Sequence, residues 1–185
     1  MQRPGEIRNS IMLLNEVYFW TDTVKDWKHL LKQDKYKQTI IDSWKLLKER
    51  NLINIYGFVI MPNHLHVIWE MLSKNGKEIP HASFNKFTGA YIINDLKENH
   101  KAVLPYFKVE EKERGYRVWQ RDPLAILMDF KNKLEQKLNY LHHNPLHERW
   151  NLSEKPELYP WSSARFYETG VDDFGFLTHY LERFG

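Results

Sequence analysis

Two histidines one residue apart stand at the start of an apolar run in residues 61–70, MPNHLHVIWE. In a β-strand, residues i and i+2 point to the same face. His64 and His66 would therefore lie side by side, while the intervening apolar residues face the other way. Such a pair can share one metal ion, or it can be two polar residues on a solvated sheet face. Because the pair directly follows a Pro-Asn break, it would lie at a sheet end, where ligands are rigid yet open to a substrate.

Two imidazoles leave a metal site incomplete, and a later helix offers further candidates. Gln136, Tyr140 and Asn144 are spaced four residues apart and share one helix face, with Lys133 and Lys137 as neighbours. The tyrosine is either an amphipathic residue lying across a surface groove or a nucleophile. A tyrosine hydroxyl can attack a phosphodiester when a metal polarises the phosphate and cations stabilise the developing charge. Asn144 is placed to add an oxygen ligand to that metal.

Four residues are expected to contact DNA if this interpretation holds. Arg121, Lys133 and Lys137 would bind phosphates, and an exposed Trp119 ring could stack on an unpaired base. Each has an alternative. The helix lysines can be solvated side chains, and Trp119 can be a core residue.

The elements that must position these residues follow from periodicity. β-branched and aromatic runs predict strands, and apolar residues spaced by three and four predict helices. The predicted strands are 16–24, 53–60 and 64–71, with a short strand at 116–120. Two helices are predicted within 26–50 and over 81–98, and residues 99–115 are predicted to be a charged loop. The last predicted helix opens at Asp122-Pro123 and ends at Asn144-Pro145, and its apolar face consists of Leu127, Phe130, Leu134, Leu138 and Leu141. This order predicts an α+β, ferredoxin-like domain with an antiparallel sheet and packed helices.

Composition narrows the classes of function. The chain has 185 residues, of which 42% are hydrophobic, which suits one domain with a core of about 16–168 and a C-terminal tail of 169–185. The absence of cysteine excludes disulfides, thiolate metal sites and a cysteine nucleophile. A net charge of +3 is compatible with a polyanionic partner. No apolar run approaches the length of a membrane helix or a signal core, so we expect a cytoplasmic protein.

Four blocks, MPNHLHVIW, VWQRD, NYLHHNP and YPWSSARFY, together resemble the REP-associated tyrosine transposases in order and spacing. These belong to the single-tyrosine HUH transposases of small bacterial insertion sequences, named for their His-hydrophobic-His motif. The resemblance spans about residues 16–168. The chain departs from it after WQRD, where PLAIL follows, and after Asn-Pro, where LHERW follows.

The resemblance implies a role for each matching residue. His64 and His66 match the metal-binding pair, and Asn144 matches the position of the third ligand, with Mg²⁺ or Mn²⁺ as the ion. Tyr140 matches the tyrosine that attacks single-stranded DNA, becomes joined to its 5′-phosphate and releases a 3′-hydroxyl. The implied fold is ferredoxin-like, and the implied partner is single-stranded or hairpin DNA near palindromic repeats in the bacterial nucleoid.

Two other functions stay open from the sequence alone. One is a single-stranded nucleic-acid-binding domain without catalysis, since ferredoxin-like sheets with aromatic faces bind bases by stacking. The other is a metal-dependent phosphodiesterase that uses activated water. Both a homodimer and a monomer are compatible with the resemblance, because some relatives supply the tyrosine helix from a second chain.

Overall fold

The computed structural model describes residues 12–111, 114–121 and 123–185. Its main sheet has four strands in the order β2-β3-β1-β6, and every neighbouring pair is antiparallel. The strands are β1 (Val17–Thr23), β2 (Ile53–Ile60), β3 (His64–Met71) and β6 (Leu124–Leu127). The predicted hairpin of β2 and β3 is confirmed, with Ile60 opposite Leu65 across the Pro-Asn turn.

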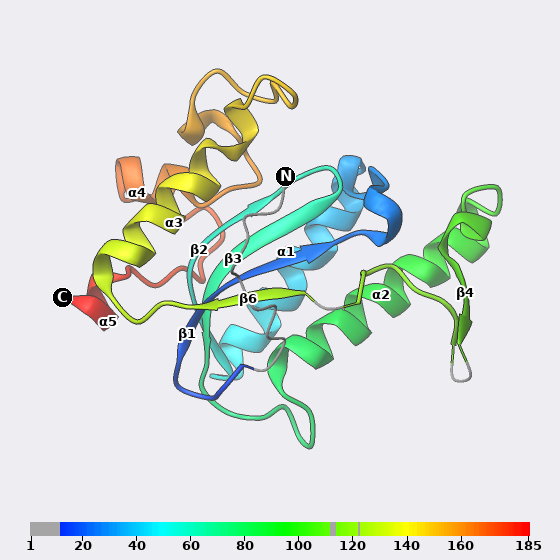
Figure 1. The fold of residues 1–185 in the computed structure, drawn as a ribbon, viewed down its shortest axis with the longest axis horizontal. Helices are drawn as coiled ribbons and strands as arrows, with labels where there is room; N and C mark the ends of the chain where they lie inside the picture. The colour runs from blue at the N-terminus through cyan, green and yellow to red at the C-terminus, as the bar shows by residue number, and fades with distance from the viewer. Residues whose placement is uncertain (1–11, 112–113, 122) are drawn as a thin grey trace, which may run out of the picture.

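Helices cover both faces of this sheet. Helices α1 (Asp34–Glu49) and α2 (Pro80–Asn99) lie on one face, and α3 (Lys131–His143) lies against the other (Figure 1). Together with the order β1-α1-β2-β3-α2-β6 along the chain, this sheet order is the ferredoxin-like arrangement, as predicted. Helix α3 is an addition to this arrangement, and it covers the sheet face that α1 and α2 leave uncovered.

Smaller elements complete the fold. They are the 3₁₀ turns η1 (Lys25–Trp27), η2 (Leu30–Lys32), η3 (Leu104–Phe107), η4 (Asn144–Leu146) and η5 (Pro156–Leu158), the hairpin of β4 (Lys108–Glu111) and β5 (Arg114–Tyr116), and the short helices α4 (Ala164–Thr169) and α5 (Leu181–Phe184). The β4-β5 hairpin projects beyond the end of α2 (Figure 1). No helix among the described residues is long and apolar enough to cross a membrane.

The prediction for the last helix is wrong at its start. Residues 124–127 form the edge strand β6, in which Leu127 pairs with Tyr18, and α3 begins only at Lys131. Asp122, the predicted cap, lies outside the described residues. The open edge of β1 explains the difference, because pairing along it satisfies backbone groups that a longer helix would leave without partners. The fourth strand is thus 124–127 rather than 116–120, where Trp119 forms only an isolated bridge with Val24.

Strand β3 is buried on both faces, and its side chains alternate between two cores. Leu65, Val67 and Trp69 pack under α1 and α2, in a core that also contains the stacked rings of Trp20 and Trp69. Ile68 faces α3 in a second core. The same period of two places the paired histidines on the α3 face.

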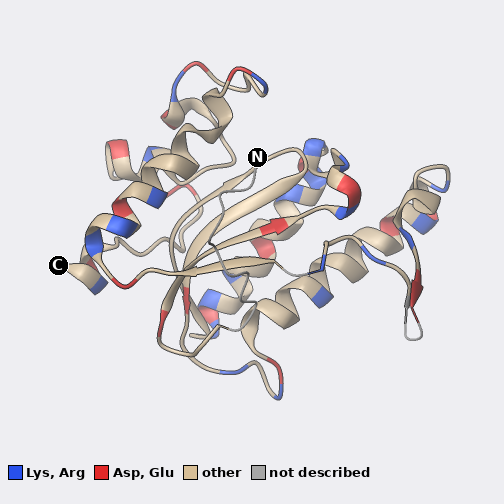
Figure 2. Ribbon diagram, in the orientation of Figure 1, with Lys and Arg blue, Asp and Glu red and all other residues tan. Residues whose placement is uncertain are grey.

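Close approach of α3 to the sheet depends on Gly57, at an irregularity in the β2-β3 pairing. A Cβ atom at this position would collide with the side chain of Leu138 on α3. The helix therefore packs where the strand has no side chain. Lysines recur along the same helix, where Figure 2 shows blue segments.

Candidate active site

Strand register places the two histidines beside β1. Thr23 lies opposite His64, and Thr21 lies opposite His66. The Thr21 hydroxyl is 2.7 Å from His66 Nδ1, and the imidazole centroids of His64 and His66 are 4.8 Å apart. Both side chains are buried. The pair is therefore rigid and close enough to act as one unit.

The amide of Asn63 fixes the tautomer of His64. Its Nδ2 donates to the carbonyl of Trp27 at 3.2 Å, which leaves its Oδ1 facing His64 Nδ1 at 2.6 Å. Since that oxygen can only accept, Nδ1 of His64 carries the proton and Nε2 keeps its lone pair. This is the arrangement in which an imidazole can bind a metal.

Burial keeps both imidazoles neutral. Desolvation, with a smaller effect from the positive charge of Arg149, lowers the pKa of His64 to about 4. Desolvation also lowers the pKa of His66 well below its usual value, helped by His64, Lys137 and Arg149. Neutral imidazole is the form that binds a metal, so both side chains are in the state that a metal site requires at neutral pH.

Tyr140 comes to this pair from α3, and Asn144 stands one turn later, at the end of the same helix. Asn144 follows the last residue of α3 in helical conformation and is only 1% exposed. The Tyr140 ring lies 5.4 Å from the His66 ring between centroids and 6.2 Å from Phe19, while 44% of the residue is exposed. The chain thus brings its own tyrosine to its own histidines, beside solvent.

Three polar atoms at this site lack hydrogen-bond partners in the described part of the chain. They are Nε2 of His66 and both side-chain atoms, Oδ1 and Nδ2, of Asn144, and all are buried. Leaving such atoms unpaired costs about 1–3 kcal/mol each, so an arrangement of this kind points to a missing partner. Two imidazole nitrogens and an amide oxygen fit a divalent cation, with positions left for water or phosphate.

Among the residues that the structure describes, no group of three or more His, Cys, Asp or Glu side chains could hold a metal ion. A third protein ligand beside the two histidines is therefore expected to be of another type. Asn144, at the end of α3, carries an amide of this kind, and its role as a metal ligand stays a prediction.

The predicted DNA-contacting residues fall into different places. Lys137 Nζ lies 4.9 Å from the Phe19 ring centre and 5.9 Å from that of Tyr140, so it belongs to the site. Lys133 is a turn away and pairs with Asp129 at 2.9 Å. Arg121 is exposed and pairs with Glu111 at 3.0 Å.

Trp119 requires a correction. It is 4% exposed, and its indole N–H donates to Thr88 of α2 at 2.9 Å. Its ring therefore packs in the core under α2, and it has no face free for stacking on a base. The edge bridge with Val24 explains this, since it turns the side chain to the helix-covered face.

Sequence reasoning missed several residues around the pair. Thr21 and Asn63 orient the imidazoles, and Arg149 supplies positive charge beside them. Trp150 lies 5.9 Å from His64 between ring centroids, and Trp27 lies 6.2 Å away on an exposed turn. Only Asn63 had a sequence signal, because it directly precedes the His-x-His pair; the others become neighbours through strand register and chain folding.

Comparison with known proteins gives a likeness in fold. No family model matches the chain, and no curated protein matches it. A solved structure described as a REP-associated tyrosine transposase bound to a REP hairpin aligns over 92% of this chain and 90% of that chain, with a TM-score of 0.55 and 15% sequence identity. The two chains share a fold, which agrees with the ferredoxin-like class predicted from the sequence.

Proposed function

We propose that this chain is a REP-associated-type tyrosine transposase that cleaves and rejoins single-stranded DNA through a covalent 5′-phosphotyrosine. One observation carries the proposal. The exposed Tyr140 ring lies 5.4 Å from the buried His66 ring, beside polar atoms that lack partners within the described ranges. The proposed nucleophile and the proposed metal-binding residues therefore belong to one chain and lie close together.

The side chains divide the chemistry among them. The phenolic oxygen of Tyr140 attacks phosphorus and loses its proton, while the bond from phosphorus to the 3′-oxygen breaks and that oxygen leaves as a hydroxyl. The ammonium of Lys137, near the Tyr140 ring, stabilises the phenolate and the charge on the phosphate. A 3′-hydroxyl of a second strand reverses the step, so that rejoining needs no external energy source.

His64, His66 and Asn144 would hold a divalent cation, Mg²⁺ or Mn²⁺. When bound, such an ion polarises the scissile phosphate. The neutral state of both histidines and the buried, unpartnered amide of Asn144 support this assignment. The mixed nitrogen and oxygen set favours Mn²⁺ over Mg²⁺ in affinity.

The substrate class follows from the fold and the surface. The structural neighbour is bound to a REP hairpin, and α3 of this chain carries several lysines. Hairpin DNA with single-stranded flanks is therefore the proposed substrate. The exposed setting of Tyr140 suits an extended strand, because a duplex would keep the phosphate away from the sheet.

A covalent-capture experiment tests the proposal. End-labelled hairpin oligonucleotides with randomised single-stranded flanks are incubated with the protein and Mn²⁺ or Mg²⁺, and the products are separated on a denaturing gel. We expect a protein-DNA adduct that disappears with EDTA and with Tyr140→Phe. Tyr91→Phe is the matched control, because Tyr91 is also about half exposed but lies on α2, on the opposite sheet face.

Three results would contradict the proposal. An adduct retained in Tyr140→Phe would assign the nucleophile elsewhere. Metal-dependent cutting that persists in Tyr140→Phe without an adduct would indicate a phosphodiesterase that uses water. DNA binding without cleavage, insensitive to EDTA and to His64→Ala, would indicate a binding domain.

A further inference from the structure

The turn after β1 holds a tryptophan in an unfavourable backbone conformation. Asp26 and Trp27 have φ of 55° and 56°, in the left-handed region that favours glycine. Bulky residues adopt it rarely, and strain of this kind costs about 1–3 kcal/mol per residue. Nevertheless, 57% of Trp27 is exposed, so core packing does not repay the strain. A ring held outward at such a cost suggests a binding role.

The turn is fixed by the same residue that orients a proposed metal ligand. Asn63 Nδ2 donates to the Trp27 carbonyl, and Asn63 Oδ1 accepts from His64. The Trp27 amide N–H also donates to the Val24 carbonyl at 2.9 Å. Trp27 is therefore positioned relative to His64 by one shared amide, and its ring centroid lies 6.2 Å from that of His64.

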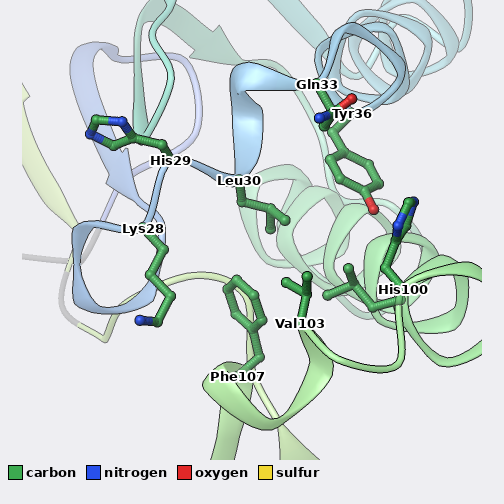
Figure 3. A pocket seen from close by; sticks show the side chains of 9 residues that line it. Lys28, His29, Leu30, Gln33, Tyr36, His100, Val103 and Phe107 are labelled. Atoms are coloured by element: carbon green, nitrogen blue, oxygen red, sulfur yellow. The ribbon is translucent and has the colours of Figure 1, made fainter.

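Two further aromatic rings lie one after the other beyond His64. The Trp150 ring lies 5.9 Å from His64, and His29 lies 5.6 Å from Trp150. His29 borders a cavity of about 280 Å³ between η2 and α2, and in Figure 3 its ring turns away from the other lining side chains. The Arg149 guanidinium carbon lies 5.1 Å from the centre of the Trp150 ring. Aromatic rings and a cation thus lie near His64.

We propose that Trp27 is a stacking platform for an unpaired base of the DNA strand, at the nucleotide next to the phosphate that Tyr140 attacks. The proposal rests on the function proposed above, and it names the contact that holds the strand. Aromatic faces bind bases without demanding a sequence, and nearby cations bind the backbone. Asn63 then links the position of the DNA strand to the proposed metal site, because it forms hydrogen bonds with both Trp27 and His64.

Binding measured without catalysis tests this platform. A fluorescein-labelled oligodeoxythymidylate of about 20 nucleotides is titrated with protein in EDTA, and its anisotropy is followed. We expect Trp27→Gly to weaken binding about tenfold, the usual loss for one stacked base, and Trp27→Tyr to retain most of the affinity. The matched control is Tyr91→Ala, which should bind as the parent does. Alanine is used at this position because glycine would destabilise the helix that contains Tyr91.

Trp27→Gly is chosen because glycine accepts a positive φ. We expect its melting temperature to equal or exceed that of the parent, which separates lost stacking from lost folding. An abasic scan then locates the contact. Removing the stacked base should weaken binding to the parent and leave the affinity of Trp27→Gly unchanged, whereas removing any other base should affect both proteins alike.

The outcomes separate this inference from the proposed function. If the parent forms the phosphotyrosine adduct but Trp27→Gly binds and cleaves as the parent does, the platform is wrong and the transposase function stands. If no protein forms an adduct, but one abasic position weakens binding to the parent and leaves the affinity of Trp27→Gly unchanged, the platform stands and the catalytic function fails. Failure of the parent to bind the oligonucleotide contradicts the platform.

Discussion

The two faces of the main sheet both bury polar side chains, but they do so differently. Under α1 and α2, Asp22 is fully buried, with Asn85 as a hydrogen-bonding neighbour. Beneath α3, His64, His66 and Asn144 are buried together. We refer to the first as the closed face and to the second as the open face.

The closed face is sealed by aromatic packing. The Trp44 and Phe84 rings stack at 5.6 Å, and Trp20 and Trp69 stack at 4.9 Å. Burial raises the pKa of Asp22 to about 8, so that its carboxyl group is protonated at neutral pH, although hydrogen bonds from Asn85 and from the backbone of Thr23 act in the opposite direction. Unpartnered polar atoms occur on this face too, among the described residues, and they include the indole nitrogens of Trp20, Trp44 and Trp69.

The open face has buried polar groups beside an exposed tyrosine. Nε2 of His66 and both side-chain polar atoms of Asn144 lack partners in the part of the chain that the structure describes, and Tyr140 is accessible to solvent. The comparison teaches that buried polar groups do not by themselves mark a site. Access for a substrate and a reactive group within reach mark one.

Replacing Asn144 by leucine should give the largest effect. The variant keeps a side chain of similar size and removes the buried amide, so we expect the metal-free protein to be as stable as the parent or more stable. Cleavage should fall by about a hundredfold or more, because a bound metal supplies several kcal/mol of charge stabilisation. The rise in melting temperature caused by Mn²⁺ should disappear as well.

Thermal unfolding with and without Mn²⁺, together with the cleavage assay, measures both effects. Asn139→Leu, at an exposed position on the same helix, is the control and should retain the response to metal. Loss of metal-free stability in Asn144→Leu would mean that the amide is structural, and the distinction between the faces would fail.

On the closed face, Asp22→Asn should increase stability. The folded pKa of about 8 exceeds the ordinary value of 3.8, so the folded state holds a proton that the unfolded state releases between these pH values. This carboxyl therefore lowers the free energy of unfolding progressively as pH rises from about 4 to about 8. Asparagine does not titrate, so the variant does not lose this part of the free energy of unfolding as pH rises.

Urea unfolding of the parent and of Asp22→Asn over this pH range gives the difference between their free energies of unfolding. The difference should grow with pH and level off near the folded pKa. The buried histidines act in the opposite direction at lower pH, but they are common to both proteins and cancel. A difference independent of pH would show that Asp22 is ionised in the folded state.

The smallest effect is expected within α3. Lys137→Gln should slow cleavage about tenfold, since one partly exposed cation near the tyrosine contributes about 1.4 kcal/mol. Lys133→Gln should change the rate less than about twofold, because this lysine already pairs with Asp129 at the surface. Single-turnover cleavage rates compare the two variants. Equal losses would indicate general attraction of DNA rather than a role at the open face.

Much of the open face was predictable from local patterns. The alternation in β3 predicted that His64 and His66 share a face, and helical spacing predicted that Tyr140 and Asn144 lie near each other. Both β2 and β3 begin and end where the β-branched runs predicted. These features depend on neighbours in sequence, which is why one sequence sufficed.

What was missed depends on contacts between distant segments. Asp-Pro and the apolar spacing around Leu127 are typical of a helix start, but the free edge of β1 draws residues 124–127 into the sheet. Nothing local distinguishes Trp119, which the fold buries, from Trp27, which the fold exposes. The Thr21–His66 contact follows from strand register, which is set by the two whole strands.

The continuity of α3 with Asn144 has one further consequence. Because Asn144 keeps helical geometry directly after His143, it moves with Tyr140 as one rigid body. Under the proposed function, an outward movement of this segment with DNA attached to Tyr140 would also remove Asn144 from the proposed metal site. The attached strand would then be protected from early resealing, because the phosphotyrosine and Asn144 would return to the site only together.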